Sequence, residues 1–269
     1  MGTQLSGVEH VIAVASGKGG VGKSTVASNL ALALHAEGYR VALLDADIYG
    51  PSLGTMMGAE GKRPEVRGDR LQPVMAHDIQ CMSMSFVASE RTPMVWRGPM
   101  ASSTLQQLLS QTEWQNRQIL VVDMPPGTGD IQLTLAQRVQ LSGAVIVTTP
   151  QDIALLDACK GIEMFTKVQV PVLGIIENMS THICSSCGHE EAVFGSGGGS
   201  RIASEYNTRM LAQLPLSLEI REHSDTGHPL VAAEPDGQIA SSLRSAAREI
   251  AAMVFARPPT GPAINVIDD

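Results

Sequence analysis

A glycine-rich octapeptide near the start of the chain constrains the fold more than any other feature. Residues 17–24 read Gly-Lys-Gly-Gly-Val-Gly-Lys-Ser, a complete phosphate-binding loop with an additional lysine at its second position. An apolar run at 11–15 precedes the loop, and a helix-forming stretch at 24–37 follows it. This strand–loop–helix order separates a nucleotide site from a chance glycine-rich turn. The sequence therefore predicts that the chain binds a nucleoside triphosphate.

The residue types of the loop define the expected nucleotide contacts. Its backbone N–H groups are expected to surround the β-phosphate, at the positive end of the dipole of the following helix. We expect Lys23 to reach β- and γ-phosphate oxygens, the Ser24 hydroxyl to bind Mg²⁺, and Thr25 to donate to the α-phosphate. The predicted nucleotide-binding residues of the loop are Gly17, Lys18, Gly19, Gly20, Val21, Gly22, Lys23, Ser24 and Thr25.

Lys18 is the unusual member of the loop. Because a second lysine cannot easily serve its own nucleotide, we expect Lys18 to cross a dimer interface onto the partner's phosphates, as an arginine finger does. The alternative is a solvated loop lysine. The loop resembles the deviant Walker A motif of the MinD/ParA/iron-protein class of P-loop ATPases, and this resemblance implies dimerisation that depends on nucleotide.

Size and charge limit the other possibilities. With 269 residues, of which 43% are hydrophobic and 17% charged, the chain predicts one α/β domain over 1–256, followed by a mobile tail over 257–269. Its 27 acidic and 19 basic residues give a net charge of -8, which offers no electrostatic footprint for nucleic acid or an anionic membrane. No apolar run is long enough to span a bilayer, so we expect a cytoplasmic protein.

Alternating strand and helix patterns predict a mainly parallel sheet flanked by helices, as in a P-loop NTPase of the deviant Walker A type. Strands are expected at 10–15, 40–44, 79–84, 118–122, 143–148, 171–176 and 209–213. Helices are expected at 23–37, 101–110, 131–140, 153–166, 199–206 and 237–255.

Carboxylates follow two of these strands. In open parallel sheets the ligand lies beyond the carboxyl ends of the strands, where catalytic acids are to be sought. Asp123 is the Walker B candidate that holds Mg²⁺. Asp47 is the candidate for orienting the attacking water, and Asp45 a neighbour whose charge contacts the metal shell. A turn-capping role is the alternative for Asp45.

The segment after Asp123 predicts a conformational switch. It reads Pro125-Pro126-Gly127-Thr128-Gly129-Asp130. Pro126 stiffens the chain before Gly127. Gly127 would let a backbone N–H move onto the γ-phosphate and release this phosphate after hydrolysis.

A second chemical signal is the sequence Cys184-Ser185-Ser186-Cys187-Gly188-His189, within a loop at 180–190. Cys-x-x-Cys followed by glycine places two sulfurs on one side of a tight knuckle, where they can share a metal or cluster. Closed sites usually need four protein ligands, so we expect another copy of Cys184 and Cys187 to supply the rest. Cys81 and Cys159 are interpreted as small buried hydrophobic residues.

Other interpretations of the knuckle remain open. A redox-active pair would usually begin a helix in a thioredoxin-like unit, whereas this pair lies in a polar loop. Zinc held by Cys184, Cys187 and either His182 or His189 is a further possibility, and spacing alone does not choose between zinc and an iron-sulfur cluster.

Several longer motifs together resemble the Mrp/ApbC family of iron-sulfur cluster carrier ATPases. They are Asp47-Ile48-Tyr49-Gly50-Pro51-Ser52, Val95-Trp96-Arg97-Gly98-Pro99-Met100, the switch at 123–130, and Glu177-Asn178-Met179-Ser180 before the knuckle. The resemblance implies a homodimer that binds ATP, hydrolyses it slowly, and holds a 4Fe-4S cluster between paired Cys184 and Cys187. It also implies cluster transfer to apo-proteins, a separate cluster donor or scaffold, and recognition of adenine by Asn178.

Rival functions predict other features. A nitrogenase-type iron protein would carry a cluster cysteine just after the switch, and no cysteine follows Asp123 closely. A MinD- or ParA-like positioning ATPase would need a basic amphipathic tail or a basic DNA-binding surface, whereas this tail ends in Asp268 and Asp269. A zinc-stabilised regulatory P-loop NTPase would use the same cysteine knuckle.

Overall fold

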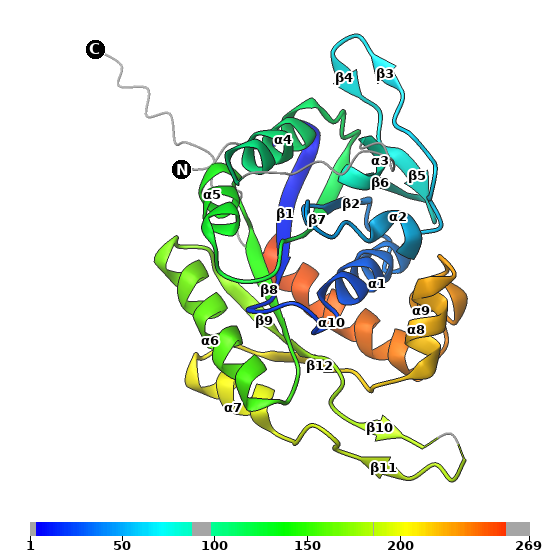
Figure 1. Ribbon diagram of the computed structural model, residues 1–269, viewed down its shortest axis with the longest axis vertical. Coiled ribbons are helices and arrows are strands. Elements are labelled where there is room, and N and C mark those ends of the chain that lie inside the picture. The colour runs from blue at the N-terminus through cyan, green and yellow to red at the C-terminus, as the bar shows by residue number, and fades with distance from the viewer. Residues whose placement is uncertain (1–3, 88–97, 185, 257–269) are drawn as a thin grey trace.

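An eight-stranded sheet forms the centre of the chain (Figure 1). The computed structural model describes residues 4–87, 98–184 and 186–256. The strand order is β12-β9-β8-β1-β7-β2-β6-β5, and every neighbouring pair is parallel except β5 with β6. The strands of this sheet are β1 (Val8–Ala15), β2 (Val41–Asp45), β5 (Val74–Ala76), β6 (Ile79–Ser83), β7 (Arg117–Asp123), β8 (Gly143–Thr148), β9 (Val172–Glu177) and β12 (Met210–Gln213).

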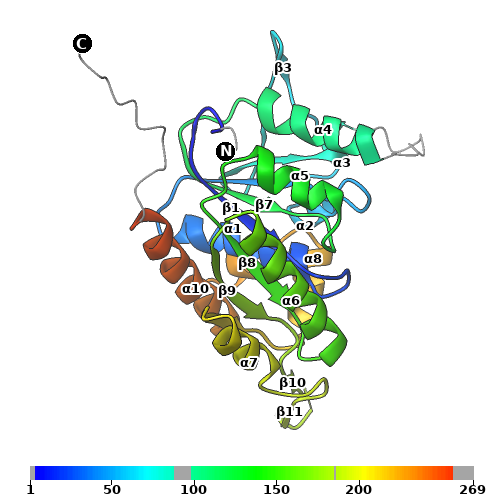
Figure 2. The same ribbon diagram turned by 90° about the vertical axis from the view of Figure 1, so that its left-hand side faces the viewer.

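Helices cover both faces of the sheet. Figures 1 and 2 show α4, α5, α6 and α7 on one face, with α1 and α10 on the other. The longer helices are α1 (Lys23–Ala36), α4 (Gly98–Gln111), α5 (Asp130–Arg138), α6 (Asp152–Lys167), α7 (Gly198–Glu205), α8 (Leu218–Asp225) and α10 (Gln238–Phe255). The four-residue helices are α2 (Leu53–Met56), α3 (Met84–Val87) and α9 (Leu230–Ala233).

The predicted fold class is confirmed. Each of the seven expected strands and six expected helices is present, with boundaries that shift by at most a few residues. The expected 257–269 tail and the residues Val95, Trp96 and Arg97 lie outside the described residues.

Small aliphatic residues build the core because the chain has few aromatic ones. The middle strands are buried along their whole length, as expected of a sheet covered on both faces. Helix α1 is buried over most of its length and packs on α10, and several alanines of both helices are buried. Short side chains allow this close approach, so the helix that begins at the phosphate loop is held firmly.

Two short hairpins and the edge strand β5 were not predicted. The hairpins are β3 (Val66–Arg67) with β4 (Arg70–Leu71), and β10 (His182–Ile183) with β11 (Glu190–Glu191). Strands of two residues, mostly exposed, leave no hydrophobic alternation to read. Helix α8 was also missed, although Ser217 caps it by accepting a hydrogen bond from the backbone N–H of Glu219.

Candidate functional site

The phosphate loop connects β1 to α1 at the carboxyl edge of the sheet. Gly22 precedes the helix with φ of 82°, a left-handed conformation that favours glycine. A Cβ atom there would lie 2.2 Å from Nδ2 of Asn178. At Gly17, a Cβ atom would lie 2.1 Å from the backbone of Asp157 in α6. Close packing around the loop therefore requires both glycines, and the left-handed turn is a second requirement at Gly22.

Lys23 and Asp123 form a buried ion pair within this site. Nζ of Lys23 lies 2.5 Å from Oδ1 of Asp123 and 3.2 Å from Oγ of Ser24. Lys23 is 6% exposed and Asp123 1% exposed. Burial raises the pKa of the Asp123 carboxyl, and the Lys23 ammonium acts in the opposite direction. The structure thus brings together the phosphate lysine, the hydroxyl and the carboxylate that the sequence singled out.

These oxygens fit the ligand chemistry of Mg²⁺. The metal prefers hard oxygen donors, and a hydroxyl and a carboxylate meet here beside a phosphate-binding loop. Ser24 and Asp123 both contact Lys23, so they lie on the same side of the site.

Asp45 is used mainly to hold the loop that follows β2. Its Oδ1 accepts the Asp47 backbone N–H at 3.0 Å, and its Oδ2 accepts from the backbone of Ser52 and Leu53 and from the Ser83 hydroxyl. Burial, and secondly the Asp123 charge, raise the pKa of Asp45 to about 7. The capping role that the sequence left as an alternative is therefore present, and contact with the metal shell stays a prediction.

Asp47 and Lys18 remain available for the roles expected of them. Asp47 is half-buried, its Oδ1 accepts the Gly50 backbone N–H at 3.3 Å, and its charge contributes to raising the pKa of Asp123. Lys18 is half-exposed, and its carbonyl accepts from the Ser16 hydroxyl at 2.8 Å. Among the described residues no ion-pair partner is found for the Lys18 ammonium.

The predicted switch is hydrogen-bonded to the residue that precedes the phosphate loop. The Gly127 backbone N–H donates to the Ser16 carbonyl at 3.0 Å, and Gly127 has φ of 95°. Pro126 lies against the loop, since its Cβ is 3.9 Å from the position a Cβ on Gly19 would take. Movement of this segment would therefore change its contacts with the loop directly.

Asn178 contacts the phosphate loop from the end of β9. Its Nδ2 donates to the Val21 carbonyl at 3.0 Å, and the residue is 6% exposed. No local spacing predicts this contact, because 157 residues separate the two partners. Recognition of adenine by Asn178 stays a prediction.

The two knuckle cysteines lie on the β10–β11 hairpin. The Cys184 backbone N–H donates to the His189 carbonyl at 2.9 Å, and the Gly188 N–H donates to the Cys184 carbonyl at 2.8 Å. Backbone N–H groups of Ser186 and Cys187 that bond to the sulfur lower the pKa of the Cys184 thiol. Cys187 is exposed. A turn that favours thiolate on an accessible sulfur suits a metal or cluster ligand.

The described residues of one copy do not complete a metal site. Within residues 4–87, 98–184 and 186–256, no three His, Cys, Asp or Glu side chains are grouped closely enough to hold a metal ion. His182 and His189 therefore do not join the two cysteines as a third ligand here. Cys81 is buried as expected, whereas Cys159 is only partly buried. All four cysteines are free.

The match to known families is decisive for classification. The family model for NUBPL iron-transfer P-loop NTPases, of the ParA group, matches residues 7–251. The chain belongs to this NUBPL iron-transfer P-loop NTPase family. Among the described helices, none is long and apolar enough to cross a membrane.

Curated relatives of this NUBPL-family chain are named iron-sulfur cluster carrier or transfer proteins. The iron-sulfur cluster carrier protein of Pseudomonas fragi is 60% identical, over 88% of this chain and 83% of the relative. That of Escherichia coli strain K12 is 55% identical, over 93% of this chain and 68% of the relative. The mouse iron-sulfur cluster transfer protein NUBPL is 49% identical, over 94% of this chain and 80% of the relative.

Solved structures support the same fold. A nucleotide-binding protein from Archaeoglobus fulgidus, solved in complex with ADP, aligns with a TM-score of 0.75 and 34% identity, over 86% of this chain and 90% of that chain. The cell division ATPase MinD of Pyrococcus furiosus aligns with a TM-score of 0.67 and 20% identity, over 91% and 99% of the two chains. At that identity the MinD likeness shows the fold alone.

Glu177 has a structural role in this NUBPL-family chain that its place in the motif at 177–180 did not predict. It is fully buried, its Oε2 accepts the Gly199 backbone N–H at 2.7 Å, and its Oε1 accepts from Gln213 at 2.9 Å. Gly199 lies at the start of α7, which follows the knuckle hairpin. Glu177 therefore ties the far end of the hairpin segment to the sheet. A charged residue at the end of an apolar strand was the available signal.

Proposed function

We propose that the chain is an ATP-hydrolysing carrier of an iron-sulfur cluster, which it holds between two copies of itself and delivers to apo-proteins. One observation carries the proposal: the chain has both a complete phosphate loop and a two-cysteine knuckle, and the knuckle has no third ligand among the described residues. The relatives' names agree with this activity.

The proposed dimer would supply the missing ligands. Four thiolates are the usual set for an iron-sulfur cluster, and a two-fold axis can place identical knuckles face to face. Two large apolar side chains next to the phosphate loop support an interface there, since Ile153 is 69% exposed and Leu156 64% exposed on α6. This helix touches the loop through Asp157 at Gly17. Ile183, on the knuckle hairpin itself, is also exposed.

Hydrolysis would use the residues gathered at the carboxyl edge of the sheet. Lys23 would leave Asp123 to reach the β- and γ-phosphates, and Lys18 of each copy would reach across to the other copy's nucleotide. Asp47 would orient the attacking water, and Asn178 would contact the base. Ser24 and Asp123, with Asp45 behind them, would hold Mg²⁺, which when bound neutralises phosphate charge.

Nucleotide would be coupled to the cluster through two segments. Pro126 and Gly127 would respond to the γ-phosphate, because the Gly127 N–H is bonded to Ser16, directly before the loop. Asn178 links the loop to the end of β9, from which the knuckle hairpin continues. We propose the cluster to be 4Fe-4S, and donors or scaffold proteins to load it. Free thiols and a labile cluster suit a reducing compartment such as the cytoplasm.

Anaerobic reconstitution with iron and sulfide tests this proposal. The wild-type chain should take up iron and sulfide and show a visible absorption band, and Cys184→Ala should lose both while still binding ATP. Cys159→Ala, which changes a cysteine away from the knuckle, is the matched control and should keep the cluster. Zinc in place of iron, or full iron content in Cys184→Ala, would contradict a shared cluster.

A further inference from the structure

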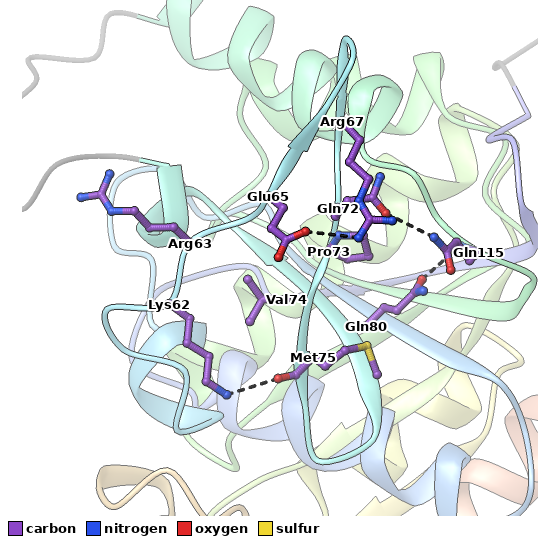
Figure 3. A pocket seen from close by; sticks show the side chains of 10 residues that line it. All are labelled: Lys62, Arg63, Glu65, Arg67, Gln72, Pro73, Val74, Met75, Gln80 and Gln115. Atoms are coloured by element: carbon purple, nitrogen blue, oxygen red, sulfur yellow. Dashed lines mark hydrogen bonds and ion pairs between the residues drawn. The ribbon is translucent and has the colours of Figure 1, made fainter.

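A groove lies beside β5, the antiparallel strand at one edge of the sheet (Figure 3). Its volume is about 540 Å³, within the range of roughly 300–1,000 Å³ that is typical of ligand pockets. The knuckle hairpin lies at the other end of the molecule (Figure 1). The groove is therefore separate from the cysteine site.

The groove is held open between β5 and the chain that leads into β3. At one end the Gln72 backbone N–H donates to the Glu65 carbonyl at 2.8 Å. At the other end Nζ of Lys62 donates to the Met75 carbonyl at 3.3 Å. Between these two contacts the two chain segments line the space from opposite sides.

Positively charged side chains outnumber acidic ones in the described lining of the groove. Lys62, Arg63 and Arg67 line it, and Glu65, paired with Arg67 at 3.2 Å, is the only acidic residue among the described residues of the lining. The lining therefore carries a net positive charge in a chain whose total is -8. Such a local reversal of sign favours an anionic ligand.

One buried amide also faces this groove. Gln80 is 5% exposed, and its Oε1 accepts the Gln115 backbone N–H at 3.2 Å. Within the described part of the chain, the Nε2 group of Gln80 donates to no protein acceptor. Because the bond from Gln115 fixes the oxygen end of the Gln80 amide, its Nε2 group is left to donate to an acceptor in the groove.

We propose that this groove binds an extended acidic segment of a partner protein, added alongside β5. Among the described strands, β5 pairs with β6 alone, and an edge strand is a template for a further strand. Lys62 would exchange the Met75 carbonyl for a carboxylate of the segment, which would free that carbonyl to accept a backbone N–H. Arg67 and the Gln80 amide would bind further carboxylates, and the exposed Met75 side chain would pack against the segment.

Binding of such a segment is separate from cluster transport and does not depend on it. A segment bound here would act as a tether that raises the local concentration of a partner, while the knuckle stays free. Binding at β5 requires neither nucleotide nor cluster, so it is measured on the purified full chain alone.

Fluorescence anisotropy with a labelled peptide of alternating glutamate and valine tests the proposal. The wild-type chain should bind this probe, and should bind the same peptide with glutamine for glutamate at least about tenfold more weakly. Lys62→Glu with Arg67→Glu should weaken probe binding by about tenfold or more, with ATP hydrolysis unchanged. Gln80→Glu, which keeps the acceptor for Gln115 but removes the Nε2 donor, should weaken it by about fivefold.

The matched control is Arg209→Glu with Arg221→Glu, two exposed arginines elsewhere whose reversal changes the net charge equally. It should leave probe binding within about twofold of wild type. Equal weakening in this control would mean a general charge effect and would overturn the proposal. So would equal binding of the glutamine peptide, or displacement of the probe by inorganic phosphate at constant ionic strength, which would indicate a small-anion site.

Discussion

The side-chain amide of Asn178 donates to the carbonyl oxygen of Val21 at 3.0 Å, which joins the end of β9 to the phosphate loop. Four residues later the chain enters the hairpin that carries Cys184. The Ser180 backbone N–H donates to the Leu214 carbonyl at 2.9 Å and fixes the segment between them. The nucleotide and cysteine sites are thus linked by a short, hydrogen-bonded stretch of one chain.

Asn178→Ala should weaken ATP binding. The change leaves the Val21 carbonyl without its buried donor, and a lost hydrogen bond of this kind costs about 1–3 kcal/mol, or roughly 5- to 150-fold in affinity if the loop is distorted accordingly. Calorimetric titration with ATP measures the effect. Gln137→Ala, an exposed side chain on α5, serves as the control. Equal affinities for wild type and Asn178→Ala would mean that this bond does not support the loop.

Lys23→Ala should abolish ATP hydrolysis and also destabilise the fold. Removing the ammonium leaves the buried Asp123 carboxylate unpaired, which typically costs about 3–5 kcal/mol. Adding Asp123→Asn should restore much of the stability but none of the hydrolysis. Urea unfolding and phosphate release measure the two effects separately. A double variant as unstable as Lys23→Ala would show that the ion pair is not the source of the loss.

The stability of the chain should fall as pH rises from about 4 to about 7, through Asp45. Burial raises the pKa of this carboxyl to about 7, above its value in the unfolded chain, so the folded state keeps a proton that the unfolded state releases. Over this window the contribution is roughly 4 kcal/mol, at about 1.4 kcal/mol per pH unit. Below both pKa values it has no pH dependence.

Asp45→Asn should remove this part of the pH dependence, whatever its effect on stability at a single pH. The measurement is the free energy of unfolding in urea at several pH values. Asp69→Asn, at an exposed position, should keep the wild-type slope. An unchanged slope in Asp45→Asn would assign the pH dependence to another group.

Cys184 should react with iodoacetamide at lower pH than an ordinary cysteine. Backbone N–H groups of Ser186 and Cys187 stabilise its thiolate and lower the pKa of the thiol. Ser186→Pro removes one of these donors and should raise the midpoint of the alkylation profile, while Ser186→Ala keeps the donor and should not. Mass spectrometry of digested protein follows Cys184 alone. Identical midpoints in the two variants would mean that the backbone does not activate this sulfur.

Local patterns predicted the parts of this molecule that are local in origin. The phosphate loop and the buried strands are continuous in sequence, so periodicity and spacing were sufficient for them. The contact of Asn178 with Val21 depends on how distant strands are ordered in the sheet, which no spacing reveals. The capping role of Asp45 was visible only as an alternative, because an aspartate after a strand suits a turn as well as a metal. Strand β5 has three residues, too few for a pattern, and the groove beside it is lined by residues that are separated in sequence.

Native mass spectrometry of anaerobically reconstituted protein tests the central claim most directly. A cluster shared through Cys184 and Cys187 predicts a dimer that carries four irons and four sulfides per two chains, and that falls to cluster-free chains in Cys187→Ala. A monomer that retains iron or zinc on a single chain, or a dimer whose metal content is unaffected by Cys187→Ala, would contradict it.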